Sequence, residues 1–243
     1  MKRIIILGGG FGGVYTAKHL LKQLREEDHA EIILINKTNY FLFSLMLHEV
    51  ATGGLNRSNI VQPIREILKH PKFTFLRCTI QAIDAAKKII HTEKASLKYD
   101  YLVIALGAQN DFFNIPGAQE FSYPLKTLED AVKVRNHILD CLEYSSAIMH
   151  SKPIEAYLNF VIVGGGPTGV ELAGELAEYV DQNLRINYKQ LNHIKRKIVI
   201  VQRAPTIIPF MDESSRAKAL NALQKRGVTI MTNAAVTKVT KES

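Results

Sequence analysis

Two glycine-rich stretches, GGGFGG at residues 8–13 and GGGPTG at residues 164–169, share the spacing Gly-x-Gly-x-x-Gly. In this pattern the first glycine permits a tight turn and the second lets the backbone approach a ligand. The third allows a helix to pack closely on a strand. Amides at the start of such a helix can donate to an anion, and the helix dipole favours negative charge there. The pattern therefore suits the binding of a pyrophosphate.

Both stretches lie in the same local context. Each follows a short apolar run, IIIL at 4–7 or NFVIV at 159–163, and precedes a segment with apolar residues at helical spacing. A second apolar run then follows, EIILI or KIVIV. Strand, glycine turn, helix and strand make a βαβ unit with a parallel sheet. One such motif is weak evidence, but two predict two dinucleotides, a tightly bound flavin and an exchanging nicotinamide.

Further elements complete the expected organisation. The sequence predicts helices over 41–51, from Pro63 to about Lys69, over 127–148 and over 213–226, a β-meander over 73–98, and strands over 101–106 and 228–232. Thr127 is the expected N-cap of its helix, with Asp130 three residues on as an imperfect capping box. The predicted fold class is α/β, with two Rossmann-like dinucleotide-binding domains, parallel sheets and a meander. The second domain is expected to be inserted in the first, with a boundary near residue 153, so that residues 1–152 bind FAD and residues 153–243 bind NAD(P).

Composition narrows the function classes. The formal charge is +8, but basic residues are spread along the chain and are not interleaved with aromatics, so nucleic acid is not expected as a partner. No stretch approaches the ~18 apolar residues of a membrane span. The only cysteines, Cys78 and Cys141, form no close pair, which fits a reducing compartment and indicates neither a metal site nor a disulfide framework.

With these motifs in place, the sequence resembles the two-dinucleotide-binding-domain flavoproteins, and among them the type II NADH dehydrogenases, which are NADH:quinone oxidoreductases. The stretches that carry this resemblance are LGGGFGG, NYFLFSLMLHEVATGGL, ALGAQNDFFNIPG, PLKTLEDAVKVRNHIL, VIVGGGPTGVELAGELAE and IVIVQRAPTIIP. The resemblance runs through all 243 residues. It implies hydride transfer from NADH or NADPH to FAD, followed by delivery of two electrons to a quinone.

The resemblance also implies roles for individual residues. Those implied to hold the flavin pyrophosphate are Gly8, Gly10, Phe11, Gly12 and Gly13. The other flavin contacts are Asn36 and Lys37 at the adenosine ribose, Ile80 at the adenine, Ala105, Leu106 and Gly107 along the flavin, and Thr52 and Gly53 near its ring. The nicotinamide nucleotide is assigned to Gly164, Gly166, Pro167, Thr168 and Gly169. Glu171, one turn into that helix, is the residue expected closest to the nicotinamide, although a first-turn acid also suits the helix dipole.

The end of the second nicotinamide-domain strand, VQRAP, departs from the usual pattern. A carboxylate there binds the ribose hydroxyls of NAD and repels the 2′-phosphate of NADP. This chain has Gln202 and Arg203 instead. We therefore expect NADPH to be accepted; the alternative is that Gln202 bonds the ribose of NAD and Arg203 points into solvent.

The region 44–54, SLMLHEVATGG, lacks the redox CxxxxC of related disulfide reductases, so electrons are expected to pass from the flavin directly to a diffusible acceptor. His48 and Glu49 could form a proton relay, but neighbours on a helix do not share one face.

The family continues well past residue 243, so we expect an incomplete enzyme without the returning flavin strand and the C-terminal membrane helices. The implied location is peripheral, on the cytoplasmic side of a membrane, through segments outside this chain, which alone could be soluble; a homodimer is left open. Two alternatives share both motifs: a soluble NAD(P)H-dependent flavin or ferredoxin reductase-like flavoprotein, and an inactive nucleotide-binding relative.

Overall fold

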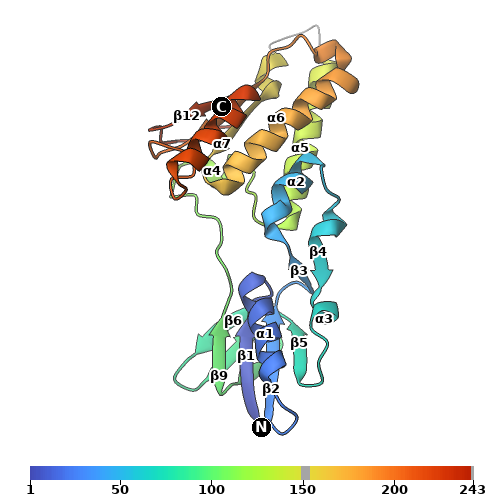
Figure 1. Ribbon diagram of the computed structural model, residues 1–243, viewed down its shortest axis with the longest axis vertical. Coiled ribbons are helices and arrows are strands. Elements are labelled where there is room, and N and C mark those ends of the chain that lie inside the picture. Colours follow the sequence, from blue (N-terminus) through green and yellow to red (C-terminus); the bar gives the residue numbers. More distant parts are fainter. Residues whose placement is uncertain (149–153, 242–243) are drawn as a thin grey trace. The chain divides into compact units, whose positions relative to one another are not determined.

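The computed structural model describes residues 1–148 and 154–241 (Figure 1). Packing divides the chain into two compact units. The first comprises Met1–Phe43 and Ser58–Gln109, and the second Ser44–Arg57 and Asn110–Ser243. The predicted domain boundary near residue 153 lies outside the described residues. The division into a FAD domain and an NAD(P) domain is a separate matter from this packing and stays a prediction.

The first unit is built on a parallel sheet with the strand order β5-β2-β1-β9. Its elements are β1 (Lys2–Leu7), α1 (Phe11–Gln23), β2 (Ala30–Asn36), β5 (Phe73–Arg77) and β9 (Tyr101–Ile104). Successive side chains of a strand point to opposite faces, and both faces are buried here. Ile6 and Leu34 pack with Val14 of α1, whereas Ile5 and Ile33 pack on the other face.

An antiparallel meander covers that other face. It comprises β6 (Ile80–Asp84), β7 (Ile89–Thr92) and β8 (Ser96–Lys98). Ile90 of β7 is fully buried and packs in one cluster with Ile5, Leu7 and Ile35. The predicted α/β class, with parallel sheets and a meander, is confirmed. The meander is shorter than predicted, because Phe73–Arg77 pairs in parallel with β2 and belongs to the main sheet.

The second unit carries a smaller parallel sheet with the order β10-β11-β12. These strands are β10 (Asn159–Val163), β11 (Lys197–Val201) and β12 (Val228–Met231), and the main helices are α2 (Leu47–Thr52), α5 (Leu128–Ala147), α6 (Pro167–Ile186) and α7 (Glu213–Lys225). Ile198 and Ile200 of β11 pack with Leu176 and Val180 of α6 in one core. The sheet therefore holds the glycine turn at residues 164–169 against α6, as the sheet of the first unit holds the turn at residues 8–13.

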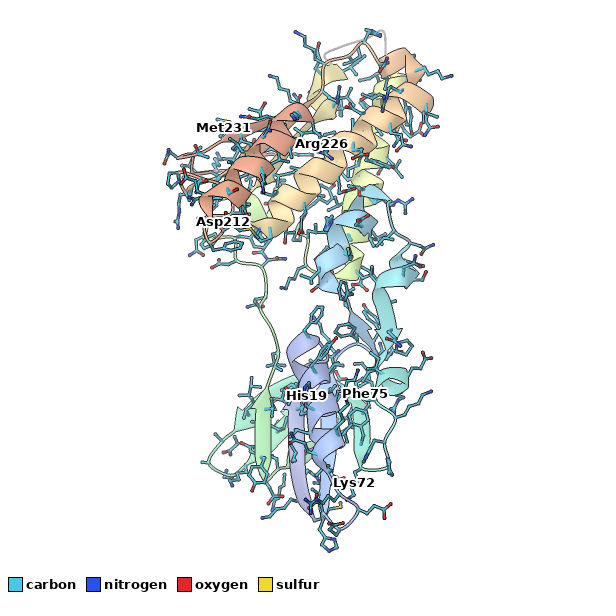
Figure 2. The ribbon with its side chains drawn as sticks, viewed as in Figure 1. His19, Lys72, Phe75, Asp212, Arg226 and Met231 are labelled. Carbon is cyan, nitrogen blue, oxygen red and sulfur yellow. The ribbon has the colours of Figure 1, made fainter. Side chains whose placement is uncertain are left out.

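Capping residues set where two of these helices begin. The Asp212 carboxylate accepts a hydrogen bond of 2.9 Å from the Ser215 amide and so caps α7, whose other end is marked by Arg226 (Figure 2). The capping box at Thr127 and Asp130 is complete, with both reciprocal hydrogen bonds present, although the acid is Asp and not Glu.

Short elements connect these frameworks. They are β3 (Tyr40–Leu42), η1 (Ser44–Met46), η2 (Arg57–Ile60), β4 (Val61–Pro63), α3 (Ile64–Ile67), α4 (Ala118–Phe121), η3 (Ile154–Leu158) and η4 (Lys189–Leu191). None of the helices in the described part of the chain is long and apolar enough to cross a membrane.

The helix predicted over 41–51 is the main error in the secondary structure. Residues 40–42 form β3, because Phe41 pairs with Gln62 of β4, and the α-helix begins only at Leu47. The apolar run at 41–47 fits either period, and the long-range strand pairing decided between them. The predicted helix from Pro63 to Lys69 is reduced to α3, and the strand over 101–106 ends at Ile104.

Candidate functional site

The first glycine loop is closed on one side and open on the other. Gly8 has a φ of +105°, and a Cβ there would collide with the carbonyl oxygen of Ala105. A Cβ at Gly13 would collide with the carbonyl oxygen of Gly8. At Gly10, by contrast, a Cβ would meet no atom of the described residues within 4 Å. The loop thus packs tightly against its sheet and leaves open space at the middle glycine.

The helix that follows directs its amides toward that space. Gly10 is the N-cap of α1 and has no side chain with which to cap it. The first intrahelical bond runs from Val14 N to the Gly10 carbonyl at 3.0 Å. The amides of Phe11, Gly12 and Gly13 precede that bond, so the helix itself cannot satisfy them. Their geometry fits a pyrophosphate at the N-terminus of α1.

Two further predicted segments end beside this loop. The Asn36 side chain, at the end of β2, lies 2.7 Å from the position that a Gly9 Cβ would take, and its Nδ2 donates to the Thr38 carbonyl at 3.0 Å. Residues 105–107 follow β9, and Ala105 N donates to Leu7 O at 2.8 Å. Parallel strands end at one edge of a sheet, which is why these distant residues meet.

The remaining residues predicted to contact FAD fall elsewhere. Lys37 is exposed, and Ile80 is half-buried in β6. Thr52 and Gly53 lie in the second unit. Thr52 is buried and donates its hydroxyl to the His48 carbonyl at 3.0 Å, while Gly53 ends α2 with a φ of +79°. The roles assigned to these residues stay predictions.

The second glycine loop resembles the first, except that a Cβ at its first glycine, Gly164, would meet no atom of the described residues within 4 Å. Gly164 has a φ of +108°. A Cβ at Gly169 would collide with the carbonyl oxygen of Gly164. Gly164 N donates to Val201 O at 2.8 Å, which ties the loop to β11. At Gly166, the N-cap of α6, a Cβ would again meet no atom of the described residues within 4 Å.

Gln202 is part of this loop's support. Its Oε1 accepts from Gly165 N at 3.1 Å, and its Nε2 donates to Thr206 O at 3.4 Å. Ile208 N donates to the Gly165 carbonyl at 2.7 Å. Arg203 is exposed. The assignment of Gln202 and Arg203 to the ribose end of the nucleotide stays a prediction, and the contact of Gln202 with the loop is visible only in the folded chain.

A cavity of about 480 Å³ adjoins the start of α6. His48 of α2 and Glu171 of α6 meet there, with His48 Nδ1 3.5 Å from Glu171 Oε2. Sequence reasoning considered His48 with Glu49 and missed the pairing with Glu171, because nothing local relates residues so far apart. The residues that line the cavity are Ser44, Leu45, Leu47, His48, Asn110, Leu125, Lys126, Pro167, Thr168 and Glu171.

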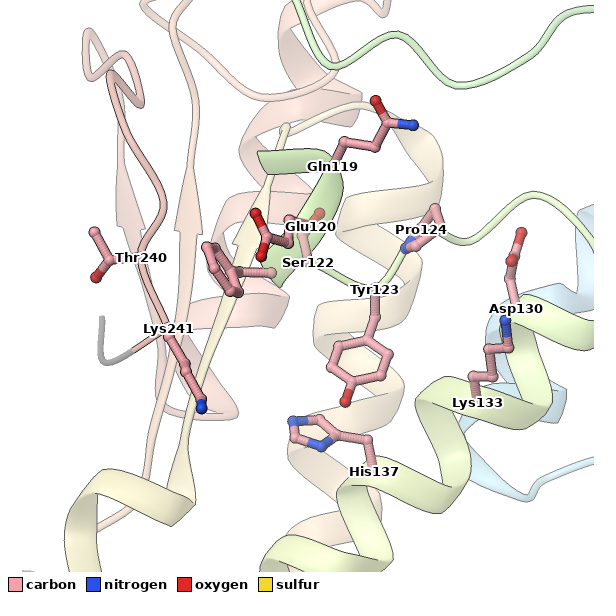
Figure 3. A pocket seen from close by; sticks show the side chains of 11 residues that line it. Gln119, Glu120, Ser122, Tyr123, Pro124, Asp130, Lys133, His137, Thr240 and Lys241 are labelled. Carbon is pink, nitrogen blue, oxygen red and sulfur yellow. The ribbon is translucent and has the colours of Figure 1, made fainter. Parts of the chain in front are cut away.

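A second cavity, of about 650 Å³, lies beside α5 (Figure 3). The Tyr123 and His137 rings stack there with their centroids 4.3 Å apart. Burial lowers the pKa of His137 against the opposing effect of Asp140. Burial also raises the pKa of Cys141, whose Sγ is 3.7 Å from His137 Nε2. None of the residues lining it is a sequence-predicted site residue.

Both glycine loops therefore leave room for a pyrophosphate: in each, the third glycine packs against the backbone of the first, and the space beside the middle glycine is open. Two such loops on parallel sheets are the arrangement typical of proteins that bind two dinucleotides. The chain belongs to the pyridine nucleotide-disulphide oxidoreductase family, whose sequence profile matches residues 2–243.

Individual relatives narrow the comparison. A probable mitochondrial NADH-ubiquinone oxidoreductase of Schizosaccharomyces pombe is 36% identical over 100% of this chain and 45% of its own length. The type II NADH:quinone oxidoreductase Ndh of Mycobacterium tuberculosis is 33% identical over 98% of this chain and 51% of its own. The predicted resemblance to type II NADH dehydrogenases is confirmed. The chain spans about half the length of these relatives.

Solved structures of related proteins have the same fold as this chain. NDH2 from Plasmodium falciparum in complex with NADH superimposes with a TM-score of 0.88 and 28% identity, over 99% of this chain and 49% of that one. The sulfide:quinone oxidoreductase of Aquifex aeolicus superimposes with a TM-score of 0.76 at 21% identity, over 99% of this chain and 53% of that one, and shares the fold.

Proposed function

We propose that this chain is part of a FAD-dependent NAD(P)H:quinone oxidoreductase. The observation that carries the proposal is the duplicated glycine loop, in which the third glycine (Gly13 or Gly169) packs against the backbone of the first and the middle glycine (Gly10 or Gly166) faces open space. Relatives named as NADH:quinone oxidoreductases match nearly the whole chain, which supports the reaction class.

The first loop is the proposed FAD site. The amides of Phe11, Gly12 and Gly13 would donate to the pyrophosphate, and Asn36 would hydrogen-bond the adenosine ribose. Residues 105–107 would run along the flavin. Asn replaces the acid usual at position 36, and an amide can still donate to and accept from ribose hydroxyls.

The second loop is the proposed NAD(P)H site. Gly164, Gly166 and the start of α6 would hold the pyrophosphate, and Glu171 would lie nearest the nicotinamide. FAD, when bound, supplies the hydride acceptor and passes two electrons on. The chain's own residues contribute positioning and exclusion of water; no side-chain nucleophile is required.

The visible absorption spectrum tests this proposal. The purified chain is supplied with FAD, separated from the excess, and mixed anaerobically with NADH or NADPH. We expect a bound flavin spectrum that bleaches with at least one donor and returns on addition of a short-chain quinone. A chain that retains no flavin, or whose flavin stays oxidised with both donors, would contradict the proposal.

We further propose a quinone held in a membrane as the acceptor, with the protein on the cytoplasmic surface. Recovery of the flavin colour on mixing with quinone-loaded vesicles, and co-sedimentation with those vesicles, is the corresponding measurement. If water-soluble acceptors re-oxidise the flavin and quinones do not, the acceptor assignment is wrong, although the flavin assignment would survive.

A further inference from the structure

We propose that His48 is a positioning residue, which holds the Glu171 carboxylate in place for the nicotinamide end of the dinucleotide. This inference rests on the proposed function, because it concerns the same NAD(P)H site. The observation behind it is the 3.5 Å separation of His48 Nδ1 and Glu171 Oε2 across two helices that are distant in sequence.

The two helices place these side chains independently of each other. α2 is anchored by Leu47, Val50 and Ala51, all buried, and α6 by buried residues of the second-unit core, among them Ala173. His48 therefore projects from a fixed backbone. Its side chain is only 12% exposed, whereas that of Glu171 is 49% exposed. The imidazole is the buried partner, and the carboxylate is the partner that a ligand could reach.

The carboxylate also faces the right space. Glu171 lines the same cavity as Pro167 and Thr168, the first two residues of α6, which directly follow the open Gly166. A dinucleotide whose pyrophosphate lies at this helix start would have one end near that cavity. Ordering an otherwise mobile glutamate before the ligand arrives removes part of the entropy lost on binding.

A general stabilising role is a weaker explanation for the pair. An ion pair with a half-exposed carboxylate contributes little to folding. Lys126, which also lines the cavity, is exposed and has a long flexible chain, so it cannot fix the carboxylate as a planar, mostly buried imidazole can. The contact between His48 and Glu171 is therefore better explained by the orientation of the Glu171 carboxylate at the cavity.

The test measures dissociation constants for two ligands with the bound flavin already reduced, so that NADH has no hydride acceptor: NADH, and ADP-ribose, which lacks the nicotinamide. The variants are His48→Ala, His48→Gln, Glu171→Gln and the double variant His48→Ala with Glu171→Gln. His193→Ala, an exposed histidine of the same unit, is the matched control. Titration calorimetry serves for both ligands.

We expect His48→Ala to weaken NADH binding about three- to tenfold, an ordinary magnitude for the loss of one polar contact. ADP-ribose binding should not change, because the glycine loop is untouched. Adding His48→Ala to Glu171→Gln should cause no further loss, since the partner that His48 positions is already impaired. His48→Gln, which can still donate, should recover part of the affinity.

The outcomes separate this inference from the proposed function. If the wild-type chain binds neither NADH nor NADPH, the nicotinamide site itself is wrong, and the role of His48 falls with it. If the wild type binds NADH but His48→Ala leaves its affinity unchanged, only the positioning role is overturned. Equal weakening of NADH and ADP-ribose would also overturn it, since a general structural role would act on both.

Discussion

At the scale of single residues, glycines with different environments have different tasks. Gly8 and Gly13 are required by the fold, because a side chain at either would strike backbone. Gly10 is not required by the fold: its φ of −85° is open to any residue, and the space beside it is empty of described atoms. A glycine that the fold does not need indicates close approach by a ligand.

Gly10→Val should therefore give a folded chain that does not retain FAD. The valine side chain would occupy the space into which the pyrophosphate must come, while the packing of α1 on β1 stays as it is. Far-ultraviolet circular dichroism and the thermal midpoint check the fold, and the absorbance at the flavin band after gel filtration checks occupancy. Gly174→Ala, at a helical position where a Cβ makes ordinary contact, is the control. Full flavin occupancy in Gly10→Val would show that the site is misplaced.

Gln202 and Arg203 decide the expected donor preference. Gln202→Glu would keep an acceptor for Gly165 N but add a charge that repels a 2′-phosphate, so preference should shift toward NADH. A charge-assisted contact contributes roughly 1.5–3 kcal/mol, or about ten- to a hundredfold in affinity. Arg203→Ala should weaken NADPH more than NADH.

Stopped-flow reduction of the bound flavin by each donor measures this preference. Gln202→Ala is a useful comparison, since it removes the contact with the loop without adding charge and should weaken both donors. A wild-type chain that excludes NADPH, with an unchanged donor ratio in both Gln202→Glu and Arg203→Ala, would leave Gln202 as a loop support only.

At the scale of the elements, α5 connects local sequence to tertiary packing. Its start is fixed locally by the capping box of Thr127 and Asp130. Its buried side chains, including Ile138 and Leu142, belong to the core of the second unit. The helix also packs against α2, which carries His48. A substitution at the cap of α5 should therefore affect stability through a local hydrogen bond, whereas a substitution at a buried position of α5 should affect it through core packing.

Thr127→Ala should lower the free energy of unfolding by about 1 kcal/mol, because it removes the Oγ1 acceptor for the Asp130 amide. Urea unfolding followed by circular dichroism is the measurement. Thr127→Ser keeps the acceptor and should recover most of the loss. An unchanged urea midpoint in Thr127→Ala would mean that packing alone sets the start of α5.

His137 of α5 should make stability depend on pH on the acid side. Burial lowers its pKa in the folded chain below the ordinary 6.5, so the unfolded chain binds the proton more readily. The folded chain therefore has its full stability from this histidine above about pH 6.5. It loses that stability as the pH falls from there through the lowered pKa of His137 in the folded chain. Thermal midpoints at pH 7.5 and 5 should differ more for the wild type than for His137→Gln. An equal difference in both proteins would place the acid sensitivity elsewhere.

At the scale of the whole molecule, the same strand–glycine loop–helix arrangement occurs twice. Each unit places a glycine loop between a parallel strand and a helix, and in each the space beside the middle glycine is open. The two cysteines fall in different units, Cys78 buried and Cys141 partly so. Electron transfer through a protein disulfide is therefore not expected, and the flavin should deliver electrons to its acceptor directly.

A double variant, Cys78→Ala with Cys141→Ser, tests this route. Alanine is chosen at position 78 because a hydroxyl in that apolar core would need a partner. Flavin reduction by NADH and re-oxidation by quinone should proceed at wild-type rates. Loss of either half-reaction with flavin occupancy intact would show that a thiol takes part.

The sequence by itself determined the two βαβ units, the glycine turns and the start of α5. These depend on interactions within a few residues: apolar periodicity, the need for Gly at a positive φ, and a side chain that caps the nearest amide. The positions of Asn36 at the end of β2 and of Gln202 directly after β11 also followed, since a βαβ unit places the end of its second strand beside its glycine turn.

Only the tertiary structure decided what distant segments do to one another. The start of the helix predicted over 41–51 is a strand instead, because β3 pairs with β4, and no local pattern in the sequence encodes that pairing. The contact of Gln202 with Gly165 and the meeting of His48 with Glu171 arise the same way, from elements brought together by the burial of their apolar faces. Local interactions thus determined where the two glycine loops lie, whereas non-local packing determined which side chains surround them.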